Sequence, residues 1–279
     1  MAPQDRQGGG GDERRPRRTS DPGSSRGNPR DRRGAPRTSG PTRARGTQPR
    51  PRDDRGASQP TGPSIPSEID AKQLAPEIRG ELTTLDKATA DYVARHLVAA
   101  GDVLDEDPEA ALAHAQAARA RSGRIAAVRE AVGIAAYRCG DWAQALAELR
   151  AARRMGSRSA LLALIADCER GVGRPERAIE LARSTEAEQL TGDDADELRI
   201  VVAGARSDLG QFEQALAALS SPPLDPTRTG QTAARLFYAY AETLLALGRP
   251  DEALQGFLKA AAADVDGVTD AEDRITELA

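Results

Sequence analysis

The side chains that most often carry catalytic or metal chemistry are few in this sequence of 279 residues. The two histidines, His96 and His114, stand far apart in the chain, and neither has a cysteine or a second histidine at metal-ligand spacing. We therefore expect no metal site. The two cysteines, Cys139 and Cys168, each stand inside an apolar helical pattern, which is typical of reduced core thiols.

Enzymatic chemistry is not indicated by the remaining residues either. No nucleophile stands beside a candidate base, and no glycine-rich phosphate loop precedes a helix, because the glycines at residues 8–11 lie in a segment without helical potential. The acidic run at residues 193–197 is explained as the first turn of a helix, where carboxylates meet the positive end of the helix dipole. We predict a non-enzymatic protein without a cofactor.

The elements that could position a functional surface begin only after a long polar segment. Residues 1–66 contain 15 Arg, no Lys and no aromatic residue, and their net charge is +8, whereas the rest of the chain carries −12. Such a segment cannot bury enough apolar surface to offset the entropy that folding would cost. We predict a disordered Arg/Gly/Pro-rich tail over residues 1–66 and a folded domain over residues 67–279.

Membrane and secretory signals are not apparent. No apolar run approaches the roughly 18–20 residues that span a bilayer, and the charged N-terminus is not followed by the apolar stretch of a secretory signal. We expect a cytoplasmic protein without a membrane partner.

From residue 72 onward, apolar helical patterns alternate with short turns that recur at a regular interval. Five turn positions are each followed, five residues later, by alanine and then by an aliphatic residue. These positions are Glu106, Gly140, Gly173, Gly210 and Gly248, spaced 34, 33, 37 and 38 residues apart. Seven residues before them stand small residues, namely Ala99, Gly133, Ala166, Ala203 and Ala241. A period near 34 residues is typical of stacked helical hairpins.

The residue types around each turn agree with helical hairpins. Glycine at the turn allows the left-handed conformation that ends a first helix. Two residues later a second helix opens with proline, where a missing N–H costs nothing, or with an aromatic residue that is expected to pack over the turn. The prolines are Pro108, Pro175 and Pro250, and the aromatic residues are Trp142 and Phe212. Leu149, Leu219 and Phe257 are expected to fill the space between hairpins.

This pattern resembles the tetratricopeptide repeat family over residues 90–263. The resemblance implies an all-α, right-handed solenoid of about five helical hairpins with a capping helix. Thr185 and Pro222 stand where the family keeps a small apolar residue, so the third and fourth second helices should end early, before loops at residues 186–194 and 220–229. A short helix is expected at residues 76–82, and a capping box at residues 269–272 should start a last helix. The tail joined to such repeats also resembles proteins of high-GC actinobacteria.

In this family the concave face, lined by the first helix of each pair, binds a peptide or helix of a partner. Helix pitch places a set of predicted groove residues on that face: His96, Glu130, Ile134, Tyr137, Arg138, Asp167, Arg170, Ile200, Asp208, Tyr238 and Glu242. This set has no Lys or Asn, which argues against a clamp for a C-terminal carboxylate. Tyr137 and Tyr238 could be interface anchors or helix-packing residues.

Positive charge gathers in the middle of the repeats. The net charge is −7 over residues 67–118, +6 over residues 119–177 and −11 over residues 178–279. The candidate basic patch consists of Arg119, Arg121, Arg124, Arg150, Arg153, Arg154 and Arg158. These arginines could stabilise the ends of second helices through the helix dipole, or could meet phosphate or an acidic partner.

The tail offers an alternative function. Its Arg-Gly pairs resemble the tails of RNA-binding proteins, although no aromatic residue is interleaved and seven acidic residues dilute the charge. The leading hypothesis is therefore a scaffold that binds a protein partner along the concave face. The alternative is an RNA- or ribosome-associated factor that uses the tail and the basic patch, and a purely solvated tail is also consistent with the composition.

Overall fold

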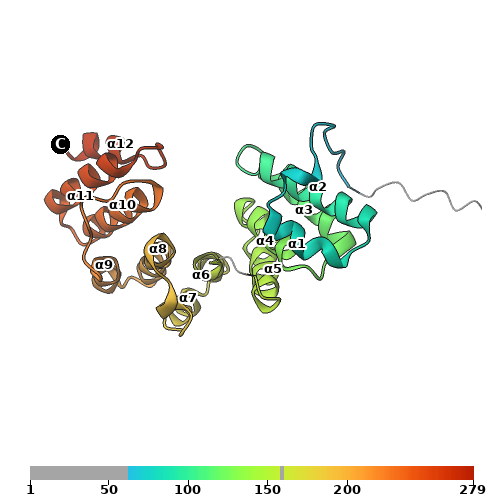
Figure 1. The fold of residues 1–279 in the computed structure, drawn as a ribbon. Coiled ribbons are helices and arrows are strands. Elements are labelled where there is room, and N and C mark those ends of the chain that lie inside the picture. Colours follow the sequence, from blue (N-terminus) through green and yellow to red (C-terminus); the bar gives the residue numbers. More distant parts are fainter. Residues whose placement is uncertain (1–61, 158–159) are drawn as a thin grey trace, which may run out of the picture. The chain divides into compact units, whose positions relative to one another are not determined.

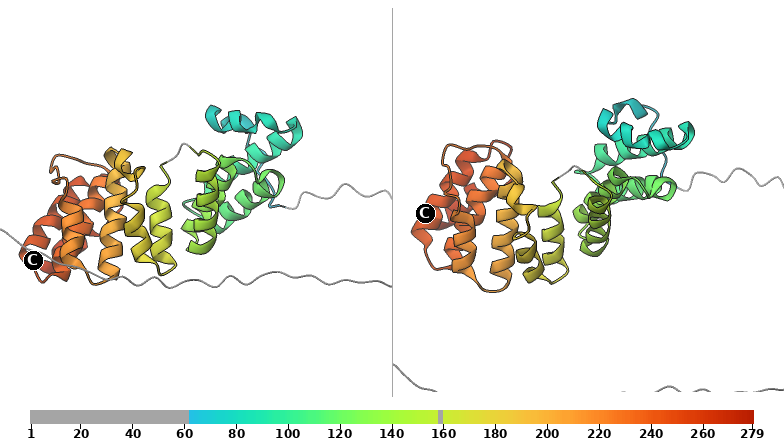
Figure 2. Two further views of the ribbon diagram at one scale, coloured as in Figure 1. Left: turned by 90° about the horizontal axis from the view of Figure 1, so that it is seen from below. Right: turned by 60° about the horizontal axis from the view of Figure 1, so that its bottom comes forward.

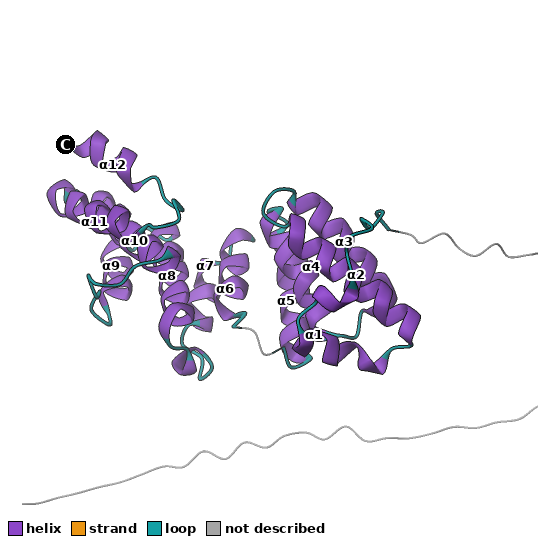
Figure 3. Cartoon of the chain, turned by 45° about the horizontal axis from the view of Figure 1, so that its top comes forward, coloured by secondary structure: helices purple, strands orange, loops and turns teal. Residues whose placement is uncertain are grey.

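The computed structural model describes residues 62–157 and 160–279, and all regular structure within these residues is helical (Figures 1 and 3). The predicted disordered tail falls almost wholly outside the described residues, and residues 62–66 have no regular secondary structure. The all-α prediction is confirmed. None of the helices in the described ranges is both long and apolar enough to cross a lipid bilayer.

The helices follow one another in sequential pairs. The bounds are α2 Lys87–Val103 with α3 Pro108–Ser122, α4 Ala126–Arg138 with α5 Trp142–Arg154, α6 Leu162–Gly171 with α7 Pro175–Leu181, α8 Gly192–Asp208 with α9 Phe212–Ser220, and α10 Gln231–Ala246 with α11 Pro250–Ala263. Each second helix packs on its partner and on the first helix of the following pair. In both views of Figure 2 the helices drawn from yellow to red lie side by side in chain order.

The turns have the geometry that their residues predict. Gly140, Gly173, Gly210 and Gly248 all have positive φ angles, between 70° and 77°. A residue with a Cβ costs roughly 1–2 kcal/mol in this left-handed conformation, so glycine ends each first helix at little cost. Pro108, Pro175 and Pro250 each occupy the first position of a second helix, as predicted.

The small residues allow the two helices of a pair to approach closely. A Cβ atom added to Gly133 in α4 would lie 2.7 Å from Cγ of Leu149 in α5, so only glycine fits against this leucine. Ala241 of α10 lies in the same way against Gly256 of α11. Leu149, Leu219 and Phe257 are fully buried, which confirms their predicted place in the core.

The third and fourth pairs have short second helices, as predicted. Helix α7 has 7 residues and α9 has 9. The loop predicted at residues 186–194 is shorter in the structure, because a 3₁₀ turn forms at Ala187–Gln189 and α8 already begins at Gly192. Asp193 and Asp194 stabilise this earlier start, since they lie in the first turn, where the helix dipole favours negative charge.

Trp142 contacts both its own hairpin and the next one. Its ring lies edge-to-face on Tyr137, just before the Gly140 turn, with centroids 5.1 Å apart. It also lies against Gly171 at the end of α6, where an added Cβ would be 2.4 Å from the indole Cγ.

One local prediction was wrong. The last helix, α12 at Ala271–Leu278, has Asp270 as its N-cap residue and no capping box. The Thr269 hydroxyl instead donates to Asp264 at 2.6 Å, which ties the loop before α12 to the end of α11.

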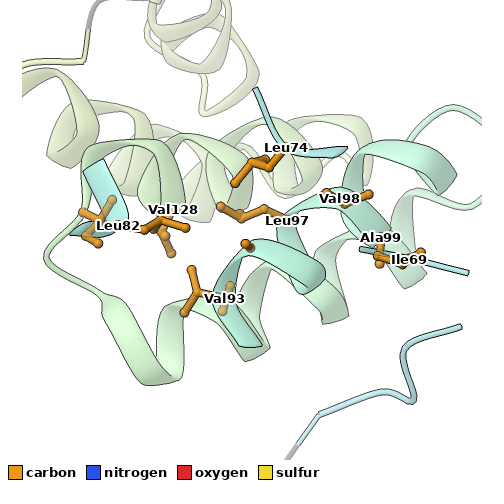
Figure 4. Packing of buried hydrophobic residues seen from close by; sticks show 11 residues of the cluster. Ile69, Leu74, Leu82, Val93, Leu97, Val98, Ala99 and Val128 are labelled. Carbon is orange, nitrogen blue, oxygen red and sulfur yellow. The ribbon is translucent and has the colours of Figure 1, made fainter. Parts of the chain in front are cut away.

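A short N-terminal segment packs on the first two pairs. It contains a 3₁₀ turn at Ala71–Gln73, α1 at Pro76–Glu81 and a second 3₁₀ turn at Leu82–Thr84. Leu74 and Leu82 are buried in one cluster with Leu97 of α2 and Val128 of α4 (Figure 4). A Glu81 carboxylate oxygen accepts the backbone N–H of Ala127 at 3.1 Å and so satisfies a free donor in the first turn of α4.

Candidate functional site

The predicted groove residues do not form one continuous surface but divide among several places. His96 is not on an exposed face: it is 1% exposed, and its Nδ1 lies 2.9 Å from Nδ1 of His114. The two histidines, which stand far apart in the sequence, meet because pairing of α2 with α3 brings together residues that are 18 positions apart. Ile200 is half-buried in a core cluster, and Arg138 pairs with Asp105 at 2.6 Å.

Four of the predicted residues form a continuous polar chain across three first helices. Tyr137 of α4 donates its hydroxyl hydrogen to Asp167 of α6 at 2.6 Å. Arg170, one turn later in α6, contacts Asp167 at 2.7 Å and Asp208 of α8 at 2.9 Å. Burial, with the hydrogen bond to Asp167, raises the pKa of Tyr137, so this residue is a hydrogen-bond donor throughout the physiological range.

The guanidinium group of Arg170 lies against Gly204, a residue that we did not predict to take part in the groove. A Cβ atom added to Gly204 of α8 would lie 2.6 Å from Cζ of Arg170. Glycine thus makes room for Arg170 to lie across α8 and reach Asp208. The only sequence signal is a glycine inside a helical pattern, where it costs roughly 1 kcal/mol relative to alanine unless packing requires it.

Glu130 and Ile134 line a pocket of about 840 Å³ between the N-terminal segment and α4. We call it the α1–α4 pocket. Its apolar lining consists mainly of Leu74, Ile78, Leu97, Ile125, Ile134 and Met155. Acidic side chains, Glu77, Glu81 and Glu130, outnumber the one basic side chain, Arg124, among its charged lining residues. The pocket therefore combines apolar walls with a negatively charged edge.

The last two predicted groove residues, Tyr238 and Glu242, face the capping helix. Arg274 of α12 contacts Glu242 at 2.7 Å. Burial and a hydrogen bond with Asp270 raise the pKa of Tyr238. The ring of Tyr238 also packs edge-to-face on Phe257, with centroids 5.3 Å apart. In this part of the structure, the helix-packing interpretation of Tyr238 is the better one.

Several arginines of the candidate basic patch make ion pairs with residues of other elements. Arg119 pairs with Glu148 at 2.9 Å, and Arg150 and Arg153 pair with Glu169 and Glu186. Arg121 lies over the ring of Tyr92, 4.7 Å from its centroid. Arg124 and Arg154 are exposed, and Arg158 lies outside the described residues. Much of the positive charge that we predicted to be available to a partner is thus paired with acidic or aromatic side chains of the same chain.

The glutamates of these ion pairs were missed by sequence reasoning. Glu148 and Glu169 are only 5% and 1% exposed. Glu148 stands three residues after Ala145 and four before Ala152, which are both fully buried, so helical spacing already placed it on the apolar face of α5. A buried carboxylate requires a partner, and Arg119 together with Arg129 supplies it.

The cysteines and acidic residues provide no reactive centre in the part of the chain that the structure describes. Both cysteines are free, and burial raises the pKa of the Cys168 thiol to about 12, so this thiol is protonated and unreactive at neutral pH. No group of three or more His, Cys, Asp or Glu residues lies close enough to hold a metal ion there.

Comparison with known proteins agrees with the repeat pattern in the C-terminal pairs. Residues 160–267 match a family described as tetratricopeptide repeat. The matched residues include α6 to α11, and such repeats are generally modules of protein interaction. The first two pairs lie outside the match, although they have the same helix order, and the second of them has the same left-handed glycine turn, at Gly140. No curated protein was found to match the sequence.

Proposed function

We propose that this chain is a non-enzymatic scaffold that binds a peptide or helix of a protein partner on the surface lined by the first helices. An apolar side chain of the partner would enter the α1–α4 pocket. The pocket is the observation that carries the proposal, because about 840 Å³ is within the usual range of roughly 300–1,000 Å³ for ligand sites. The repeat match supports protein interaction as the general role.

The chemistry of the pocket favours a partner segment of a particular kind. Its walls are aliphatic, and Met155 at its edge is 43% exposed, so a large apolar side chain would replace water at an apolar surface. Glu77, another exposed lining residue, favours lysine or arginine beside the apolar anchor. The partner segment would thus be apolar on one face and basic on the other.

The polar chain from Tyr137 to Asp208 would hold the binding surface in place rather than contact the partner. Its donors and acceptors already bind one another, and this fixes α4, α6 and α8 relative to each other. A surface that is already ordered loses less conformational entropy on binding. In this proposal Tyr137, Asp167 and Arg170 position the groove, while Glu130 and Ile134 contact the partner.

The proposal is tested by selecting peptides on the intact protein. A random 12-residue display library is bound to the full chain and to an Ile134→Asp variant, which places a charge in the pocket. We expect the wild-type protein to enrich peptides that combine a large aliphatic or aromatic residue with Lys or Arg. The affinity of the selected peptides should fall at least tenfold in the variant, because burying an unpaired carboxylate is costly.

Three further measurements make the test specific. Glu77→Lys alters only an exposed charge at the pocket edge and should weaken the same peptides by several-fold without affecting folding. Leu258→Asp, at an exposed apolar residue of α11, should leave binding unchanged. Enrichment of acidic peptides, or equal binding by Ile134→Asp, contradicts the proposal. Binding of labelled single-stranded RNA at low ionic strength, with no peptide enriched, would favour the RNA-associated alternative.

A further inference from the structure

The only two histidines of the chain form a buried pair that the proposed function does not use. Nδ1 of His96 in α2 and Nδ1 of His114 in α3 are 2.9 Å apart, and the two residues are 1% and 7% exposed. Two nitrogens at this distance share one hydrogen, so one histidine donates and the other accepts. Both rings must be neutral or share a single added proton for this bond to persist.

The N-terminal segment lies directly on this pair. A Cβ atom added to Gly62 would lie 2.7 Å from Cβ of Ala117, 3.0 Å from the hydroxyl of Tyr92 and 3.4 Å from Cε1 of His96. Tyr92 in turn packs edge-to-face on His96, with ring centroids 4.4 Å apart. The backbone at Gly62 therefore lies directly against the ring of His96, which is 1% exposed.

The same segment continues from the histidine pair to the α1–α4 pocket. The Ile69 carbonyl accepts a hydrogen bond from Arg95 Nε at 2.9 Å. Leu74 is buried beside Leu97, the residue that follows His96, and both leucines line the pocket. Residues 62–74 thus connect the contact with His96 to one wall of the pocket.

The surroundings oppose a positive charge on the pair. Burial lowers the pKa of His96 to about 4, and the nearby cations His114, Arg95 of α2 and Arg121 of α3 act in the same direction. Burial also lowers the pKa of His114. No carboxylate of the described residues acts on either ring, neither from α2 and α3 nor from the N-terminal segment. A second proton would put two N–H groups face to face and remove the hydrogen bond.

We propose that the His96–His114 pair is a pH-sensitive latch, which holds residues 62–74 on the first helical hairpin at neutral pH and releases them on acidification. Opening admits water to both rings and relieves the repulsion between the protonated histidines. Because residue 74 lines the α1–α4 pocket, release would also remove part of the pocket wall, a consequence that rests on the proposed function. The latch itself does not depend on any partner.

The direction of the pH effect follows from proton linkage. His96 has a pKa of about 4 in the closed state, compared with 6.5 for an exposed histidine. The open state therefore binds more protons between these two values, and opening becomes more favourable as the pH falls from 6.5 towards 4. At pH 5 the opening equilibrium should rise roughly 10- to 30-fold relative to neutral pH.

The latch is tested first on the unaltered full-length protein. Since the chain has only two histidines, proton NMR of their Cε1–H groups reports each titration without overlap. We expect His96 to titrate near pH 4 and His114 to titrate below the ordinary histidine value of 6.5. Hydrogen exchange of the backbone amides in residues 62–74, corrected for intrinsic rates, should accelerate roughly 10- to 30-fold between neutral pH and pH 5. Titration of both histidines near pH 6.5 would overturn the proposal.

A double variant distinguishes the effect of protonating the histidines from the effect of protonating the many carboxylates that also titrate in acid. In H96N/H114N the two amides can form a neutral hydrogen bond and cannot take up a proton. Acidification to pH 5 should then leave the exchange of residues 62–74 nearly unchanged, while α10 and α11 serve as an internal reference in both proteins. Equal acceleration in the variant and the wild type contradicts the latch. If the variant fails to fold, the histidine titration in the wild type decides the matter.

Discussion

Replacing Phe257 with alanine is expected to lower the free energy of unfolding of the C-terminal pair by about 3–5 kcal/mol. The phenylalanine is fully buried in α11. It packs against Tyr238 of α10, and the guanidinium of Arg274 in α12 lies 5.6 Å from the centroid of its ring. Alanine would leave a cavity where three helices meet, which the helices can fill only in part. Urea denaturation followed by circular dichroism measures the loss.

The neighbouring residue supplies a matched control. Leu258 belongs to the same helix but is 43% exposed, so Leu258→Ala should change the free energy of unfolding by less than about 1 kcal/mol. Because each repeat contacts only its neighbours, hydrogen exchange in Phe257→Ala should accelerate first in α10, α11 and α12. Similar losses in the two variants would show that Phe257 does not hold this core together.

The second large effect is expected at a buried ion pair between α8 and the loop before α10. Asp196 is 5% exposed and accepts hydrogen bonds from Arg199, at 2.6 Å, and from Arg228. Asp196→Asn removes the charge that both guanidinium groups face. The expected loss is about 3 kcal/mol, because the guanidinium of Arg199, whose side chain is 13% exposed, loses its charge partner, while Arg228 keeps Asp193.

Asp193 provides the control for Asp196, since it contacts the same arginine from an exposed position. Its side chain is 72% exposed and lies 2.5 Å from Arg228. Asp193→Asn should cost less than about 1 kcal/mol, as is usual for exposed ion pairs. Thermal denaturation of both variants at neutral pH gives the comparison. If Asp193→Asn is the more damaging change, burial does not determine the strength of these pairs.

The Asp196 site also fixes the end of α9. Arg199 donates to the carbonyl of Ala218 at 3.3 Å and to that of Pro222 at 2.7 Å, so the arginine that Asp196 orients satisfies carbonyls at and beyond the helix end. The sequence predicted the early end of α9 from Pro222. It did not predict that an arginine from α8 would replace the missing helical hydrogen bonds.

Local features of the fold could be read directly from the sequence. Gly140 and Gly248 indicated left-handed turns, and Pro108 and Pro250 indicated helix starts, because such residues restrict their own backbone wherever they stand. Small residues seven positions before each turn located the contact between paired helices. The 34-residue period then gave sequential pairing of helices, since each pair must cover the apolar face of the next.

Which side chains meet across helices was decided by the tertiary structure alone. Helix pitch placed Tyr137, Asp167 and Arg170 on the same type of helix face, but their hydrogen bonds depend on the offset between α4 and α6 and on the space left by Gly204. Helical spacing placed Glu148 on the buried face of α5, but nothing in the sequence indicated that it would pair with Arg119, or Glu169 with Arg150. An ion pair requires two side chains from separate elements to meet within a few ångströms.

The histidines illustrate the same limit most clearly. They stand 18 residues apart, on two different helices and not at metal-ligand spacing, so nothing in the sequence connected them. The turn between α2 and α3 folds one helix back on the other and brings His96 to His114, and Gly62 then lies against His96. Backbone preferences and apolar periodicity are properties of neighbouring residues, and they determined the helices, turns and pairing. Contacts between polar side chains depend on how packed helices are offset and rotated, and only the folded chain fixes these.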